Sequence, residues 1–110
     1  MNKNKKIVVM GGSGFLGSHV ADKLSDDKYE VIIYDLNQSP YLRPDQKMVI
    51  GDILDKSNVD NITNNAIAVY HFAALADLDE ALSKPVKTVE INLLGTIRIL
   101  EACRKNDVKR

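Results

Sequence analysis

The sequence lacks most features that mark secreted, membrane-spanning or nucleic-acid-binding proteins. It has a single cysteine, so neither an internal disulfide nor a cysteine-based metal site can form. Its 15 basic and 15 acidic residues cancel, which leaves no excess positive charge for nucleic acid or an anionic membrane. Near the start, only four apolar residues follow a lysine cluster, too few for a signal peptide or a membrane span. We therefore expect one cytoplasmic domain with no nucleic-acid, membrane or metal partner.

What the sequence does contain is a regular alternation of strand-like and helix-like segments. The predicted strands cover 7–10, 30–35, 47–50 and 67–76. The predicted helices cover 15–25, a short segment capped by Ser57, a turn over 77–83, and 85–105. The fourth strand is an almost unbroken apolar run, which is typical of a strand buried on both faces. This alternation predicts an α/β fold, a three-layer, doubly wound parallel sheet with helices on both faces.

The last predicted helix carries two apolar stripes. The stripe that we expect to cover the sheet consists of Val86, Val89, Leu93, Ile97, Leu100 and Cys103. The stripe that we expect to meet another helix consists of Ile91, Gly95, Ile99 and Ala102.

Three glycines, Gly11, Gly14 and Gly17, occur at a spacing of three between the first predicted strand and the first predicted helix. Glycine at these places permits a tight turn, a close approach of a pyrophosphate to the backbone, and close helix–strand packing. The helix N-terminus adds free N–H donors and a partial positive charge. The pattern is a close relative of the dinucleotide fingerprint, although such a turn can also be only a structural bend.

Two carboxylates follow predicted strands. Asp35 ends the second strand, 18 positions after Gly17, where a carboxylate can accept hydrogen bonds from an adenosine ribose and repel a 2′-phosphate. Asp52 follows the third strand, where its side chain and a free backbone N–H can bracket the edge of an adenine. The simpler alternatives are a strand-end cap for Asp35 and an ordinary turn for Asp52.

Together these pieces resemble the N-terminal part of extended short-chain dehydrogenases/reductases, in the NAD-dependent epimerase/dehydratase family. The matching segments occur in family order and at family spacing, and they are 11–19, Asp35, 51–53, 71–74 and 92–96. The resemblance covers nearly the whole chain. It implies that residues 1–110 form an NAD(P)-binding Rossmann domain with strand order 3-2-1-4, and that the cofactor is NAD.

The resemblance also implies a set of cofactor-binding residues. The glycine turn would hold the pyrophosphate, Asp35 the ribose, and Asp52 with Ile53 the adenine. Residues 72–75 would line the floor of the cleft, and Asn92 would help to position the active-site region. The full set is Gly11, Gly14, Phe15, Leu16, Gly17, Asp35, Leu36, Asp52, Ile53, Phe72, Ala73, Ala74, Leu75 and Asn92.

Some polar residues have simpler explanations than chemistry. His71 stands alone between two aromatic residues, and we interpret it as a satisfied core histidine. Asn92 lies in an apolar helical stretch, which favours a functional or backbone-bracing role because a buried amide needs partners. The acidic residues at 77, 79 and 80 are predicted to form a solvated helical turn rather than a metal site.

Catalysis in the resembling family needs a serine or threonine and a Tyr-x-x-x-Lys pair, in which the tyrosine is the general acid/base. The tyrosines here are Tyr29, Tyr34, Tyr41 and Tyr70, and none has a lysine four positions later. We therefore assign no catalytic residue, interpret the domain as truncated, and expect no turnover from this chain alone.

The sequence thus predicts the NAD-binding portion of a sugar-nucleotide epimerase or dehydratase, with a sugar nucleotide as a partner of the full-length parent. The alternatives are a non-catalytic NAD-sensing module and a truncated association domain. We also expect a homodimer, formed through the edge of the fourth strand or through the 86–105 helix.

Overall fold

The computed structural model describes residues 5–75 and 77–110. Within them, parallel strands form one sheet in the order β3-β2-β1-β4, which confirms the predicted Rossmann-like α/β fold and its strand order. The strands are β1 (Lys6–Met10), β2 (Glu30–Asp35), β3 (Gln46–Ile50) and β4 (Ala66–His71). The helices are α1 (Phe15–Asp26), α2 (Lys56–Thr63), α3 (Leu78–Ser83), α4 (Pro85–Val89), the π-helix η1 (Glu90–Gly95) and α5 (Thr96–Lys105).

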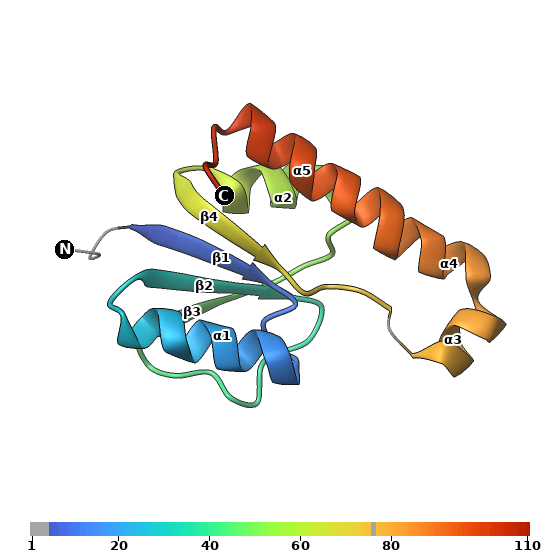
Figure 1. Cartoon of the computed structure of the whole chain (residues 1–110), viewed down its shortest axis with the longest axis horizontal. Helices are drawn as coiled ribbons and strands as arrows, with labels where there is room; N and C mark the ends of the chain where they lie inside the picture. Colours follow the sequence, from blue (N-terminus) through green and yellow to red (C-terminus); the bar gives the residue numbers. More distant parts are fainter. Residues whose placement is uncertain (1–4, 76) are drawn as a thin grey trace.

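The sheet is the middle of three layers, with α1 on one face and α2 and α5 on the other (Figure 1). Alternate side chains of β1 and β2 enter opposite layers because successive residues of a strand point to opposite faces. Ile7 and Val9 pack in the core beneath α1, whereas Val8 and Met10 pack in the core beneath α2 and α5. Both central strands are therefore buried on both faces.

The prediction for the fourth strand was wrong in two respects. The strand β4 ends at His71, and residues 72–75 continue without regular structure; Ala76 lies outside the described residues. Nor is β4 buried on both faces, because only Ala66 of its residues is fully buried and Tyr70 is exposed. A run of apolar residues identifies a strand but does not show how many neighbours cover it. Here β4 is the outer strand, and the carbonyl of Arg110 accepts a hydrogen bond from Val69 N–H.

The predicted long helix is present, but its two apolar stripes are assigned to the wrong neighbours. Gly95, Ile99 and Ala102 are buried against the α2 side of the core, whereas the stripe that includes Leu93 and Ile97 is exposed. Small residues explain the difference. A side chain at Gly95 would collide with Ile53, so the helix approaches the core closely along its small-residue face. In addition, its middle section is the π-helix η1 rather than regular α-helix.

The short helix α2 begins two residues earlier than predicted and has a different cap. The side chain of Asp55, not Ser57, accepts a hydrogen bond from Asn58 N–H at 3.1 Å. A carboxylate at this position also interacts favourably with the partial positive charge of the helix N-terminus. The predicted turn over 77–83 is the helix α3, which is capped in the same way by Asp77.

Candidate functional site

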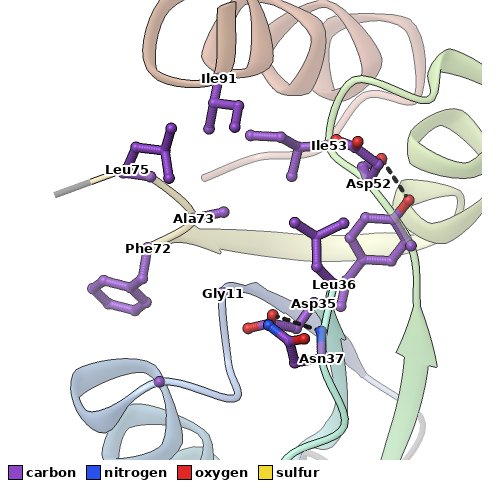
Figure 2. Close-up of a pocket in the computed structure, with 14 residues that line it drawn as sticks. Gly11, Asp35, Leu36, Asn37, Asp52, Ile53, Phe72, Ala73, Leu75 and Ile91 are labelled. Atoms are coloured by element: carbon purple, nitrogen blue, oxygen red, sulfur yellow. Dashed lines mark hydrogen bonds between the residues drawn. The ribbon is translucent and has the colours of Figure 1, made fainter. Parts of the chain in front are cut away.

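A cavity of about 300 Å³ lies at the carboxyl ends of the parallel strands (Figure 2). In open α/β sheets, ligands bind in the crevice outside these strand ends. The cavity is lined by Gly11, Gly14, Tyr34, Asp35, Leu36, Asn37, Gly51, Asp52, Ile53, Phe72, Ala73, Ala74, Leu75 and Ile91. It therefore joins the ends of all four strands to the π-helix η1.

Two of the three spaced glycines are required by the fold itself. Gly11 has a φ of +77°, and a Cβ there would lie 2.6 Å from Ala73 N, so the turn passes directly under the segment that follows β4. A Cβ at Gly17 would collide with the Gly11 carbonyl and would lie 2.9 Å from Gly12 Cα. These two glycines let the start of α1 pack tightly on the end of β1.

Gly14 is different, because the fold has room for a side chain there. A Cβ at Gly14 would contact only the Gly11 carbonyl oxygen, at 3.6 Å, and the residue is exposed to the cavity. Its φ of −79° is one that any residue can adopt. The absence of a side chain therefore keeps open a space in front of the helix rather than relieving strain.

The N-terminus of α1, which begins beside Gly14, has no side-chain cap and no acidic residue in its first turn. The helices α2 and α3, by contrast, are both capped by aspartates. The first N–H groups of a helix have no partner within it, and together with the helix dipole they favour an anion. The uncapped terminus of α1, which opens on the cavity, therefore has the chemistry to accept an anion.

Asp35 lies beside the glycine turn, at the end of β2 (Figure 2). Its carboxylate accepts hydrogen bonds from Ser13 N–H at 3.0 Å and from Asn37 N–H at 3.1 Å. The Ser13 hydroxyl also donates to the Asn37 carbonyl at 2.6 Å. These contacts hold the carboxylate in place between the glycine turn and the loop after β2, with one face toward the cavity.

The opposite end of the cavity is formed by the loop after β3. Asp52 Oδ1 accepts a hydrogen bond from Leu54 N–H at 2.9 Å, and the Asp52 carbonyl accepts one from the Tyr34 hydroxyl at 2.8 Å. Burial, and then the charges of Asp55 and Asp52, raise the pKa of Tyr34 to about 12, so its hydroxyl is a donor at neutral pH. Ile53 is buried beside Gly95 of η1.

The floor of the cavity is the segment that follows β4. Phe72 N–H donates to the Met10 carbonyl at 2.8 Å, which continues the pairing of β4 with β1. Further along, Asn92 of η1 holds both backbone groups of Leu75: its Oδ1 accepts from Leu75 N–H at 2.8 Å and its Nδ2 donates to the Leu75 carbonyl at 3.0 Å. Of the two roles considered for Asn92, the structure shows backbone bracing.

His71 is only partly satisfied, so its interpretation as a satisfied core histidine needs correction. Its Nε2 lies 2.9 Å from Thr96 Oγ1, which itself donates to the Asn92 carbonyl. The other ring nitrogen, Nδ1, is buried without a partner among the described residues. Burial lowers the pKa of His71, because it removes water from the charged form of the ring.

The structure brings most of the residues predicted for the site to this cavity and leaves four away from its lining. Phe15 and Leu16 are exposed on the first turn of α1, and Gly17 is buried beneath the turn. Asn92 acts through Leu75. Sequence reasoning missed Ser13, Tyr34, Asn37, Gly51 and Ile91 as parts of the site or its support. Ser13 and Gly51 stand inside recognised motifs, which was a usable signal; no signal singled out Ile91.

The described residues also show what else the chain holds. No cluster of three or more histidine, cysteine or acidic side chains within 5–75 and 77–110 is placed to hold a metal ion. None of the helices in these ranges has the length and apolar character needed to cross a membrane.

Comparisons with known proteins agree on one family. The family model described as NAD dependent epimerase/dehydratase matches residues 7–110. A UDP-glucose 4-epimerase of Bacillus subtilis is 34% identical over an alignment of 116 positions, which covers 94% of this chain and 34% of that protein. The crystal structure of a Brucella ovis UDP-glucose 4-epimerase in complex with NAD has a TM-score of 0.84 and 35% identity over 94% of this chain and 33% of that one. The crystal structure of a Thermotoga maritima UDP-glucose 4-epimerase with UDP-glucose has a TM-score of 0.89 and 31% identity, over 94% of this chain and 35% of that one.

Proposed function

The chain belongs to the NAD dependent epimerase/dehydratase family, and we propose that its cavity is the adenosine-pyrophosphate side of an NAD site. The chain spans about a third of the length of the relatives named above. The proposal therefore concerns only this part of a site.

The observation that carries the proposal is the open space at Gly14. The fold would accept a side chain there, yet the position is glycine, directly before an uncapped helix N-terminus. A pyrophosphate fits this arrangement, because its charged oxygens need free N–H donors and its bulk needs a backbone without a Cβ. A purely structural bend would need Gly11 and Gly17 but not Gly14.

The remaining lining fits the adenosine half of the same cofactor. The Asp35 carboxylate, held by two backbone N–H groups, would accept hydrogen bonds from the ribose hydroxyls. It would also repel a 2′-phosphate, and the lining residues include no lysine or arginine to offset that repulsion. At the far end, Asp52 would accept from the adenine amino group and the Ile53 N–H would donate to the ring. We therefore propose NAD rather than NADP as the ligand.

Bound NAD supplies a hydride acceptor, and the relatives named above are UDP-glucose 4-epimerases. We propose that the full-length parent is an oxidoreductase of this kind, acting on a sugar nucleotide. Within the 110 residues, no tyrosine stands four positions before a lysine, so we expect cofactor binding without turnover from this chain alone. A cytoplasmic location is part of the proposal and rests on the sequence.

A test of the proposal is calorimetric titration of the purified chain with NAD and with NADP. We expect weak NAD binding and weaker NADP binding, and we expect Asp35→Asn to narrow the difference between the two cofactors. Asp79→Asn, which removes an exposed carboxylate in α3, should leave the difference unchanged. Equal or tighter NADP binding to the unmodified chain would refute the assignment of Asp35. Turnover of a sugar nucleotide by the purified chain that survives repurification would contradict the expectation of binding without catalysis.

We also propose that the chain forms a homodimer, through the exposed stripe of the last helix rather than the stripe expected from the sequence. The exposed residues share one side of α4, η1 and α5, and they are Val86, Val89, Leu93, Ile97 and Leu100. An antiparallel pairing of two copies about Leu94 would place Glu90 opposite the partner's Arg98, and Lys87 opposite the partner's Glu101. Both pairs join opposite charges.

Light scattering over a dilution series tests this homodimer, with Leu93→Lys and Val69→Lys as variants. Leu93→Lys should dissociate the dimer if the helix carries it, and Val69→Lys if the edge of β4 carries it. A monodisperse monomer at high micromolar concentration would end the proposal.

A further inference from the structure

Tyr34 is the one fully buried tyrosine among the described residues, and it reaches the proposed adenine end of the cavity. Its ring comes from β2 on the α2 side of the sheet and extends beneath the loop that follows β3. The hydroxyl donates to the Asp52 carbonyl at 2.8 Å, the dashed line that ends on Asp52 in Figure 2. Asp52, in the loop between β3 and α2, is thus held by a side chain of β2, the strand that precedes β3 in the sequence.

Gly51 makes this contact possible. A Cβ at Gly51 would lie 2.7 Å from Tyr34 Cζ and 2.8 Å from Cε1, closer than side-chain carbons approach one another. The backbone of Gly51 does not itself require glycine, because Gly11 is the only described glycine with a positive φ. The glycine is therefore explained by the tyrosine beneath it.

The hydrogen bond fixes more than the carbonyl. The Asp52 carbonyl and the Ile53 N–H belong to one planar peptide group, which is trans, as are the other described peptide bonds. In a trans peptide the two groups point in opposite directions. When the Tyr34 hydroxyl and Asp55 N–H, at 2.8 and 3.0 Å, hold the carbonyl on one side, the Ile53 N–H is directed to the other.

We propose that Tyr34 is a positioning residue for base recognition: through the Asp52 carbonyl it aims the Ile53 N–H, and so makes the cavity select adenine. This inference rests on the proposed NAD site. Adenine presents an amino donor and a ring acceptor, which match the Asp52 carboxylate and the Ile53 N–H. Hypoxanthine presents an oxygen acceptor and a ring N–H donor, so both partners would be mismatched.

The experiment compares the affinities of the 110-residue chain for NAD and for nicotinamide hypoxanthine dinucleotide. We expect the unmodified chain to prefer NAD by about ten-fold or more, as expected for two mismatched hydrogen bonds. Tyr34→Phe keeps the ring and removes the hydroxyl. It should weaken NAD binding about three- to ten-fold and change binding of the hypoxanthine dinucleotide less than two-fold, so that the preference shrinks. Gly51→Ala should reduce the preference for NAD in the same way, because its Cβ would displace the Tyr34 ring that holds the Asp52 carbonyl.

Tyr29→Phe is the matched control, because Tyr29 packs in the core beneath α1 and does not line the cavity. It should leave the preference unchanged. An unfolded fraction lowers both apparent affinities by the same factor, so the ratio reports base recognition even in a destabilised variant.

Each outcome decides something. If Tyr34→Phe weakens both ligands equally, the tyrosine has only a structural role and the inference is overturned. The inference also fails if the unmodified chain binds both dinucleotides equally. If the unmodified chain binds neither, it is the proposed NAD site that fails.

Discussion

Two regions of the molecule contribute to the cavity, but they are built in opposite ways. The first is the unit formed by β1, α1 and β2, and the second is the segment that follows β4. The strands of the first unit are buried on both faces, and their core side chains are inaccessible to water. In the second, α3 and α4 contain no buried residue, and large apolar side chains of η1 and α5 are exposed. That segment meets the core mainly through Gly95, Ile99 and Ala102, and Asn92 ties its first residues, at Leu75, to η1.

The difference indicates a division of roles. The residues proposed to hold pyrophosphate and ribose are supported by the core of the first unit, so their geometry depends on global stability. The floor of the cavity depends instead on single polar contacts. Substitutions in the two regions should therefore have different consequences for stability and for ligand binding.

The largest effect is expected from truncating a core side chain of the first unit. Ile33 is 1% exposed, and Ile33→Ala should lower the free energy of unfolding by about 3 kcal/mol, through lost burial and the cavity left behind. Leu82, in α3, is 82% exposed, and Leu82→Ala should change the free energy of unfolding by less than about 0.5 kcal/mol. Urea unfolding followed by far-UV circular dichroism measures both. Similar losses for the two variants would contradict the contrast between the regions.

An intermediate effect is expected where polar contacts brace the second region internally, between its first residues and η1. Asn92→Ala removes two hydrogen bonds to the backbone of Leu75 and should lower the free energy of unfolding by about 1 kcal/mol. Because the floor would be released, NAD affinity should fall as well. The control is Asn61→Ala on the exposed surface of α2, which should leave both quantities nearly unchanged. A variant of Asn92 with normal NAD affinity would show that the floor does not need this brace.

The smallest effect is expected in the dependence of stability on pH. Burial lowers the pKa of His71 below its ordinary value of 6.5, so on acidification the unfolded chain takes up this proton first. The free energy of unfolding should therefore be maintained above pH 6.5 and fall as the pH decreases below it.

His71→Gln should flatten this decline, because the group that titrates differently in the two states is gone. His19→Gln is the control: His19 is exposed on α1, and its removal should leave the decline in place. If the free energy of unfolding falls equally below pH 6.5 in the unmodified chain and in both variants, groups other than His71 cause the decline.

Much of the fold could be predicted because local patterns and tertiary packing agree in the first unit. The second strand, 30–35, was predicted with its observed limits, since both of its faces are buried and its apolar run has no gaps. The glycine spacing and the positions of Asp35 and Asp52 identified the strand ends that the structure brings together. Each of these signals depends on residues close in sequence.

What could not be predicted depends on neighbours distant in sequence. Helical periodicity shows that the last helix has two apolar stripes, but which one meets the core depends on how closely the helix can approach. Gly95 and Ala102 allow that approach, and their small size was the available clue. Likewise, nothing local indicates that Tyr34 supports Asp52, 18 residues away in sequence.

The central claim is that the space at Gly14 exists for a pyrophosphate, and one pair of measurements tests it most directly. NAD affinity by calorimetry and the free energy of unfolding by urea titration are compared for the unmodified chain and Gly14→Ala. The account predicts that Gly14→Ala lowers NAD affinity about ten-fold or more while lowering the free energy of unfolding by about 1 kcal/mol or less, since its Cβ meets only Gly11 O at 3.6 Å and an alanine N-cap is somewhat less favourable than glycine. A variant that binds NAD as tightly as the unmodified chain would contradict it.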